Sequence, residues 1–140
     1  MTEFKVGRVL LSRLDHGEEM VAQIVDLAEK NDIRTGVFTI IGALCRAELA
    51  FYDQAAHRYQ TIKVDRPAEI VSCIGNISMR DERPFVHAHA TLSDSLGNVV
   101  GGHLSSGTVF AAEIFLQELS GEPLIRRHDP ITDLYLWSNS

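Results

Sequence analysis

The chain of 140 residues has the length of one domain and carries a net charge of −6, from 13 basic and 19 acidic residues. Hydrophobic residues make up 45% of it and charged residues 23%, a globular balance that excludes a disordered or low-complexity chain. The acidic excess, with no run of Lys or Arg, argues against duplex DNA as a partner of the isolated chain, because affinity for DNA rests largely on phosphate neutralisation.

Nothing in the sequence predicts a membrane segment or export. No apolar run approaches the ~20 residues that span a bilayer, and the N-terminus lacks the layout of a signal peptide. The two cysteines, Cys45 and Cys73, lie inside apolar stretches, which favours buried, reduced thiols over a disulfide or metal ligands. We therefore expect a cytoplasmic protein.

The first part of the chain predicts one strand and one helix. Residues 4–14 have the apolar content of a strand. A helix is expected to open at Gly17-Glu18-Glu19, with Gly17 as its cap and the acids in its first turn, where they suit the helix dipole. Its apolar residues recur at helical spacing, and Lys30 and Asn31 are expected to end it.

The rest of the chain predicts short strands separated by turns. The expected strands are residues 37–41, 46–52, 59–64, 68–78, 85–93 and 99–104. Residues 108–119 fit a helix or a strand, and their β-branched and aromatic content favours the strand. Residues 134–137 fit a short final strand or an apolar docking tail. These elements predict a single α+β domain, a mostly antiparallel sheet packed by one main helix.

Three of the six histidines lie in one predicted hairpin. His87 and His89 are two residues apart on a strand, so they share a face. Residues 94–97, Asp-Ser-Leu-Gly, fit a type I turn that ends on a left-handed glycine, which makes Asp94 face Asn98. This register places His89 directly opposite His103, with His87 on the adjacent diagonal.

The opposite face of the same hairpin supports this register. It gathers a coherent apolar surface from Val86, Ala88, Ala90, Leu92, Val100, Gly102 and Leu104. A slip of one residue would turn His103 toward that apolar face. Gly101 and Gly102, just before His103, leave room for a close backbone approach or a bulge.

Three converging imidazoles are typical of an open zinc site, with a fourth position for water or a ligand. Neutral imidazole also suits copper, nickel and ferrous iron, so the ligands alone do not fix the metal, and Zn²⁺ is our expectation. The alternative is three histidines on a half-exposed face, each satisfied by water or by the backbone. The other histidines, His16, His57 and His128, stand beside polar residues and are expected at the surface.

Several motifs resemble the PPC (plant and prokaryote conserved) domain. They are Gly42-Ala43-Leu44, Ala47-Glu48-Leu49, Glu69-Ile70-Val71-Ser72, Gly75-Asn76-Ile77-Ser78, the run from His87 to Asp94, Gly101-Gly102-His103-Leu104 and Ala112-Glu113. The resemblance covers about residues 9–119 and implies one domain over residues 1–140. It further implies a strongly curved sheet and a homotrimer. Some prokaryotic members of the family hold a metal with three histidines at positions that match His87, His89 and His103.

Plant members follow DNA-binding AT-hook motifs and recruit other transcription factors. The Arg-Gly-Arg-Pro core of the hook is absent here, where Gly7-Arg8 is followed by Val9. A DNA-associated regulator would also need a basic patch, for which the available residues are Arg80, Arg83, Arg126 and Arg127. We expect these four to be solvated loop charges paired with Asp81, Glu82 and Asp129.

Two further functions fit the three histidines. The favoured one is a homotrimeric binding, scaffold or regulatory module, whose metal is structural or binds a small-molecule ligand. The other is a metal-dependent enzyme using a metal-bound water, which would need an acid/base group. Glu113 is the best candidate for that group, because its surroundings in the sequence are apolar, and Glu48 is the second. No P-loop, nucleophile elbow or dinucleotide motif supports an enzyme, so the sequence favours binding over catalysis.

Overall fold

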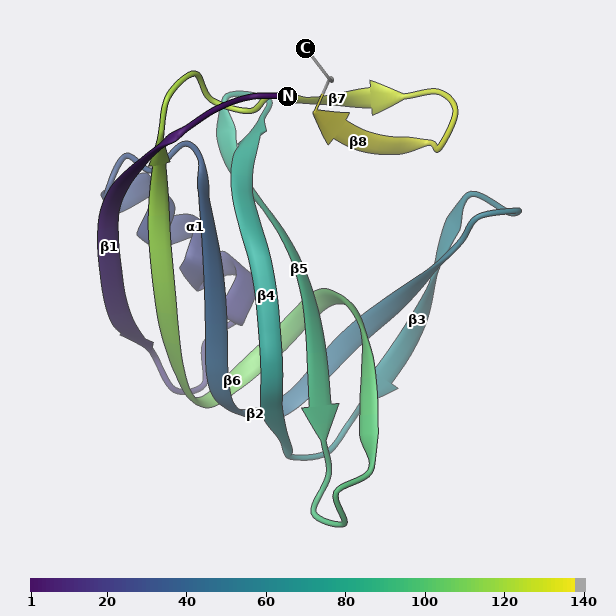
Figure 1. Ribbon diagram of the computed structural model, residues 1–140. Helices are drawn as coiled ribbons and strands as arrows, with labels where there is room; N and C mark the ends of the chain where they lie inside the picture. Colours follow the sequence, from purple (N-terminus) through teal and green to yellow (C-terminus); the bar gives the residue numbers. More distant parts are fainter. Residues whose placement is uncertain (138–140) are drawn as a thin grey trace.

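Eight strands and one helix make up residues 1–137 of the computed structural model, the part of the chain that the structure describes (Figure 1). In chain order they are β1 (Lys5–Leu14), α1 (Met20–Lys30), β2 (Gly36–Asp53), β3 (Arg58–Val64), β4 (Ala68–Arg80), β5 (Arg83–Ser93), β6 (Val99–Ser120), β7 (Arg126–Asp129) and β8 (Leu134–Trp137).

Six of these strands form one antiparallel sheet in the order β1-β6-β5-β4-β2-β3, and β6 also pairs with β2. The pairings β2–β4, β4–β5, β5–β6 and β6–β2 therefore close a ring, which curves the sheet around a single core. Fully buried side chains such as Phe38, Leu44 and Ile114 fill that core, and α1 adds Met20 and Ile24 to it. The predicted α+β fold with a curved, mostly antiparallel sheet and one main helix is confirmed.

Two long strands replace pairs of short ones. The expected strands 37–41 and 46–52 are the two halves of β2, and 99–104 and 108–119 are the two halves of β6. Gly42, the residue after the expected strand 37–41, lies at a bulge inside β2 with φ +135°, where a Cβ would lie 2.2 Å from the carbonyl oxygen of Ala111. Bulges let β2 and β6 bend without ending. The residues between the expected strands therefore form bends within one strand, not turns between two strands. The strand interpretation of residues 108–119 is confirmed.

The start of the helix differs from the prediction. Glu19, not Gly17, is the N-cap, and its carboxylate accepts hydrogen bonds from the backbone N–H groups of Val21 and Ala22 at 3.0 and 2.7 Å. The same carboxylate accepts from the N–H of Gly107 on β6 at 3.1 Å, so it ties the helix to the sheet. No acidic residue lies in the first turn itself. Gly17 has φ +82° and donates to the carbonyl of Val109. The end at Lys30 and Asn31 is confirmed.

The C-terminal part forms a second, two-stranded sheet of β7 and β8. The final strand at residues 134–137 is confirmed, whereas β7 was not predicted. In Figure 1 this hairpin lies at one end of the main sheet, beside the ends of β4 and β5. The backbone of Met79 on β4 bonds to the carbonyl of Leu124 at 2.8 Å, just before β7.

Within residues 1–137 the one helix has 11 residues, too few to cross a bilayer. Cys45 and Cys73 are free thiols, as expected. Cys73 is buried, which raises the pKa of its thiol to about 12, and Cys45 is half-buried.

Candidate metal centre

The β5–β6 hairpin has the predicted register. The N–H of Asp94 donates to the carbonyl of Asn98 and that of Gly97 to the carbonyl of Asp94, both at 3.0 Å, and Gly97 has φ +78°. His89 accordingly pairs with His103. Asp94 also accepts hydrogen bonds from the N–H groups of Leu96 and Asn98 through its side chain, which fixes the turn. Turn chemistry in the sequence therefore sets the position of the histidines.

The three imidazoles lie together on the outer face of the sheet, away from the core. One ring nitrogen from each of His87, His89 and His103 lies within 4.8 Å of the other two. The ring centroids are 5.2 to 5.7 Å apart. The remaining histidines, His16, His57 and His128, are exposed and outside this cluster, as expected.

A pocket of about 590 Å³ surrounds the cluster. The ends of β2 and β3 contribute Tyr52 and Tyr59 to one wall, and the β7–β8 hairpin contributes Tyr135 to the other. The hydroxyl of Tyr52 donates to the carbonyl of Thr132, so the two walls are in contact. Gly102 lets β6 approach β2 here, because a Cβ would lie 2.8 Å from the carbonyl oxygen of Ala50. The pocket is thus built from segments distant in sequence.

The surroundings favour neutral imidazoles. Burial lowers the pKa of His87 to about 4, with help from the positive charges of His103, Arg126 and His89. Burial also lowers the pKa of His103, as does His89. A neutral ring offers the lone pair that a metal requires, so both side chains are in the ligating form at neutral pH.

One atom of His103 shows whether the three histidines fit a metal ion. Its Nδ1 atom is buried and has no hydrogen-bond partner among the described residues. Buried polar atoms are nearly always paired, and an exception calls for a physical reason. A metal held by the three rings would supply the missing partner, so the residues present fit such an ion.

Glu113 and Glu48, the two candidates for an acid/base group, lie outside the histidine pocket. Glu113 is exposed and pairs across the sheet with Arg13 and Ile41, in the half of β6 that does not carry His103. Glu48 pairs with Lys63 and Ser106 and does not line the histidine pocket. Within residues 1–137 the one acid in its lining is Asp133, which accepts a hydrogen bond from His128 at 2.7 Å. The structure therefore brings neither glutamate to the histidines.

The prediction that the four arginines are solvated loop charges is wrong for Arg126, which is 7% exposed. Its guanidinium donates to Ser78 Oγ at 2.7 Å, to Asn76 Oδ1 at 3.0 Å and to the carbonyl of Tyr135 at 2.8 Å. It also lies over the rings of Phe85 and Trp137. No local pattern in the sequence indicates this burial, because it depends on contacts between the β7–β8 hairpin and β4.

The other three arginines differ among themselves. Arg80 is half-buried, stacks on the ring of Tyr135 at 3.4 Å and pairs with Asp81. Arg83 is exposed and pairs with Glu29, not with the expected Glu82. Arg127 is exposed. Asp129 accepts hydrogen bonds from Thr132 instead of pairing with an arginine.

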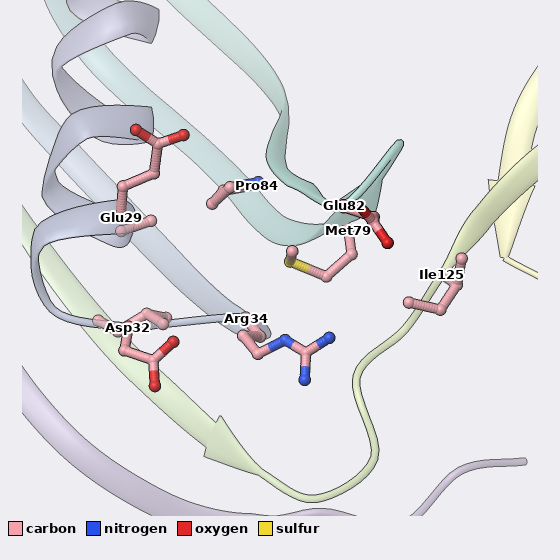
Figure 2. Close-up of a pocket in the computed structure, with 9 residues that line it drawn as sticks. Glu29, Asp32, Arg34, Met79, Glu82, Pro84 and Ile125 are labelled. Atoms are coloured by element: carbon pink, nitrogen blue, oxygen red, sulfur yellow. The ribbon is translucent and has the colours of Figure 1, made fainter.

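A larger open pocket of about 700 Å³ lies at the C-terminal end of α1, beside the β4–β5 turn. Figure 2 shows its acids, Glu29, Asp32 and Glu82, with carboxylates that point in different directions around Arg34. Of the residues that the structure describes, only the three histidines form a group able to hold a metal. Size alone therefore does not select the functional pocket, and we assign the candidate site to the histidines.

Comparisons with known proteins find one family model and several related solved structures. A model of the Plants and Prokaryotes Conserved (PCC) domain matches residues 1–120. The crystal structure of a metal-containing protein from Archaeoglobus fulgidus is 42% identical, with a TM-score of 0.95 and 99% of each chain covered. A PPC protein from Pyrococcus horikoshii is 38% identical, with a TM-score of 0.95 over 100% of this chain and 97% of that one.

More distant relatives carry other descriptions. A protein from Ralstonia eutropha, described as a candidate DNA-binding protein, is 26% identical with a TM-score of 0.82, over 93% of this chain and 90% of that one. The bifunctional protein GlmU from a Synechococcus strain is 28% identical over 123 residues. The match takes in 86% of this chain but only 18% of that protein's length.

Proposed function

The chain belongs to the family of the Plants and Prokaryotes Conserved domain, and from this membership and its histidine cluster we propose that it is a metal-binding homotrimeric module. Its ligands are His87, His89 and His103. Two observations carry the proposal: one ring nitrogen from each of the three histidines lies within 4.8 Å of the other two, and the buried Nδ1 of His103 lacks a partner among the described residues. The name of the Archaeoglobus relative, a metal-containing protein, supports it.

Zn²⁺ is the metal we propose. Three neutral imidazoles with an open side match zinc sites that keep one position for water or a ligand. His89 is exposed, which leaves that position accessible from the pocket. A binding role fits better than a catalytic one, because Asp133, the one acid in the lining, is engaged by His128.

Elemental analysis of purified protein tests this proposal. We expect about one divalent metal per chain, and His89→Ala should lose most of it, since removing one of three ligands weakens binding strongly. His89 is exposed, so the fold should persist, as circular dichroism can verify. His16→Ala is the matched control, because His16 is exposed and lies outside the cluster. Equal metal in the wild type and His89→Ala would refute the site, and the element found decides between zinc and copper, nickel or iron.

The trimer is supported by exposed apolar side chains in one row on the outer face of the sheet, called here the outer apolar row, in which three of the six residues are apolar. Cross-strand partners share a face, and the pairings link six residues into one row: Leu11, Phe115, Thr39, Ile74, His89 and His103. Leu11 is 77% exposed and Ile74 62% exposed. Exposed apolar patches mark association surfaces, and symmetric assembly of identical chains is the common way to cover them.

A further inference from the structure

We propose that the pocket around the three histidines binds a small organic carboxylate, with its anionic group against Arg126 and its apolar part between the aromatic walls. This inference rests on the proposed function for the metal, but the observation behind it is separate. It starts from a buried cation that has no acidic partner among residues 1–137.

Arg126 is the most unusual charge in the pocket. Only 7% of its surface is exposed, yet no carboxylate among residues 1–137 forms an ion pair with it. Arginine is almost never buried without a partner, because desolvating a charge is costly. Burial accordingly lowers the pKa of its guanidinium from the ordinary value. The rings of Phe85 and Trp137, at 4.9 and 4.7 Å, supply cation–π contacts but no negative charge.

The guanidinium also has donors to spare. Arginine carries five N–H bonds, and three hydrogen bonds hold Arg126, to Ser78, Asn76 and Tyr135. All three acceptors are neutral. Two N–H bonds therefore remain for a ligand, and the neutral partners fix the plane of the group. A fixed guanidinium is the side chain that best matches a carboxylate, through paired N–H···O bonds.

The rest of the lining points to the same class of ligand. Arg80, whose ion-pair partner Asp81 is exposed and does not line the pocket, adds a second cation to it, and a divalent metal at the histidines would add two more positive charges. Among the described residues Asp133 is the only negative side chain in the lining, and it is already hydrogen-bonded to His128. The rings of Tyr52, Tyr59, Phe85 and Tyr135 line the same space. A volume of about 590 Å³ suits a small molecule. Positive charge beside aromatic walls selects an organic acid over a neutral or basic compound.

Calorimetric titration of the zinc-loaded protein with benzoate tests the proposal, with neutral benzamide as the matched probe. We expect saturable binding of benzoate and at least tenfold weaker binding of benzamide. The fluorescence of Trp137, the single tryptophan, should change in parallel, because its ring lies over Arg126. Equal binding of the two probes, or no saturable binding of benzoate, would overturn the proposal. Tighter binding of inorganic phosphate than of benzoate would also overturn the assignment to carboxylates.

Two arginine variants locate the binding. Arg126→Lys keeps the charge but loses the planar fork, and should weaken benzoate binding at least tenfold. Arg80→Gln should also weaken benzoate binding about tenfold. Arg80 is half-buried and outside the hydrophobic core, so this variant still tests the carboxylate site if Arg126→Lys fails to fold. Arg83→Gln is the control and should bind as the wild type does, since Arg83 pairs with Glu29 outside this pocket. Wild-type affinity in Arg80→Gln and in folded Arg126→Lys would contradict the proposal.

The same titration on metal-free protein separates this inference from the proposed function. Protein that holds zinc but does not bind benzoate would refute the carboxylate site and leave the metal site intact. Protein that holds no metal yet binds benzoate through Arg126 would refute the metal site and leave the carboxylate site intact.

Discussion

At the scale of single residues, His87 is the histidine whose chemistry the fold changes most. Its pKa falls from 6.5 to about 4, chiefly through burial. Between these values the unfolded chain takes up a proton at this position and the folded chain does not. A fall in pH across that range therefore favours unfolding, and the loss ends below about pH 4, where both states are protonated.

We therefore predict that metal-free protein becomes less stable as the pH falls from 7 to 5. Its urea midpoint should drop over that interval, and the lowered pKa of His103 acts in the same direction. His87→Gln removes the largest shift and should flatten the dependence. A midpoint that falls as steeply in His87→Gln as in the wild type would contradict the assignment.

The convergence of the three histidines could be predicted because it follows from local rules. Alternation along a strand and the turn at residues 94–97 fix His87, His89 and His103 relative to one another. Arg126, by contrast, owes its burial to contacts with Asn76 and Ser78, about fifty residues earlier in the chain. Charge and neighbours in sequence carry no information about such a contact.

At the scale of elements, two glycines allow the backbone and the steric contributions to the stability loss of a Gly→Ala substitution to be told apart. Gly97 in the β5–β6 turn and Gly42 in the β2 bulge both have positive φ, but only Gly42 is crowded, by the backbone of Ala111. Gly97→Ala should cost about 1 kcal/mol, the usual penalty for a left-handed alanine. Gly42→Ala should cost more, because the Ala111 backbone must also move. Urea denaturation of the two variants measures the difference, and equal losses would show that the bulge relaxes freely.

Strand boundaries were the least predictable elements. Periodicity identified nearly every strand segment, but it could not show that residues 37–41 and 46–52 are continuous through a bulge. The short β7 was missed because its four residues, Arg126–Asp129, are all charged or histidine and have no strand-like apolar pattern. Its partner β8 was found through Leu134-Tyr135-Leu136-Trp137, which has one. Pairing with a neighbour, rather than propensity, makes β7 a strand.

At the scale of the whole molecule, the outer apolar row leads to a prediction about assembly. Ile74→Glu should convert the proposed trimer to monomers, because it places a charge in the middle of the row while leaving the core unchanged. Leu96→Glu is the control, since Leu96 is 84% exposed at the tip of a hairpin and outside the row. Sedimentation velocity measures both. A wild-type protein that sediments as a monomer at all concentrations would contradict the trimer.

The charge of the assembled molecule leads to a prediction about DNA. A trimer would carry 3 × −6 = −18, and Arg126 is buried while Arg83 is paired with Glu29. Two of the four arginines considered for a basic patch are therefore unavailable to phosphates, and the acidic excess of the chain opposes binding to a polyanion. Labelled duplex at low salt should therefore show no micromolar binding, with a basic DNA-binding protein as the positive control. Binding that weakens steeply with added salt would contradict this and favour the role described for the Ralstonia relative.

The pairing of β1 with β6 constrains how the chain can fold while it is being synthesised. Lys5 lies opposite Ser120 and Leu14 opposite Ala112, so within residues 1–137 β1 pairs only with a strand that is made about a hundred residues later. β2 also depends on β6 along both of its halves. Contacts so distant in sequence slow folding, and unpaired strand edges are exposed in the meantime. Nascent chains of this protein should therefore be clients of ribosome-associated chaperones until β6 emerges, because β1 has no strand to pair with before β6 is made.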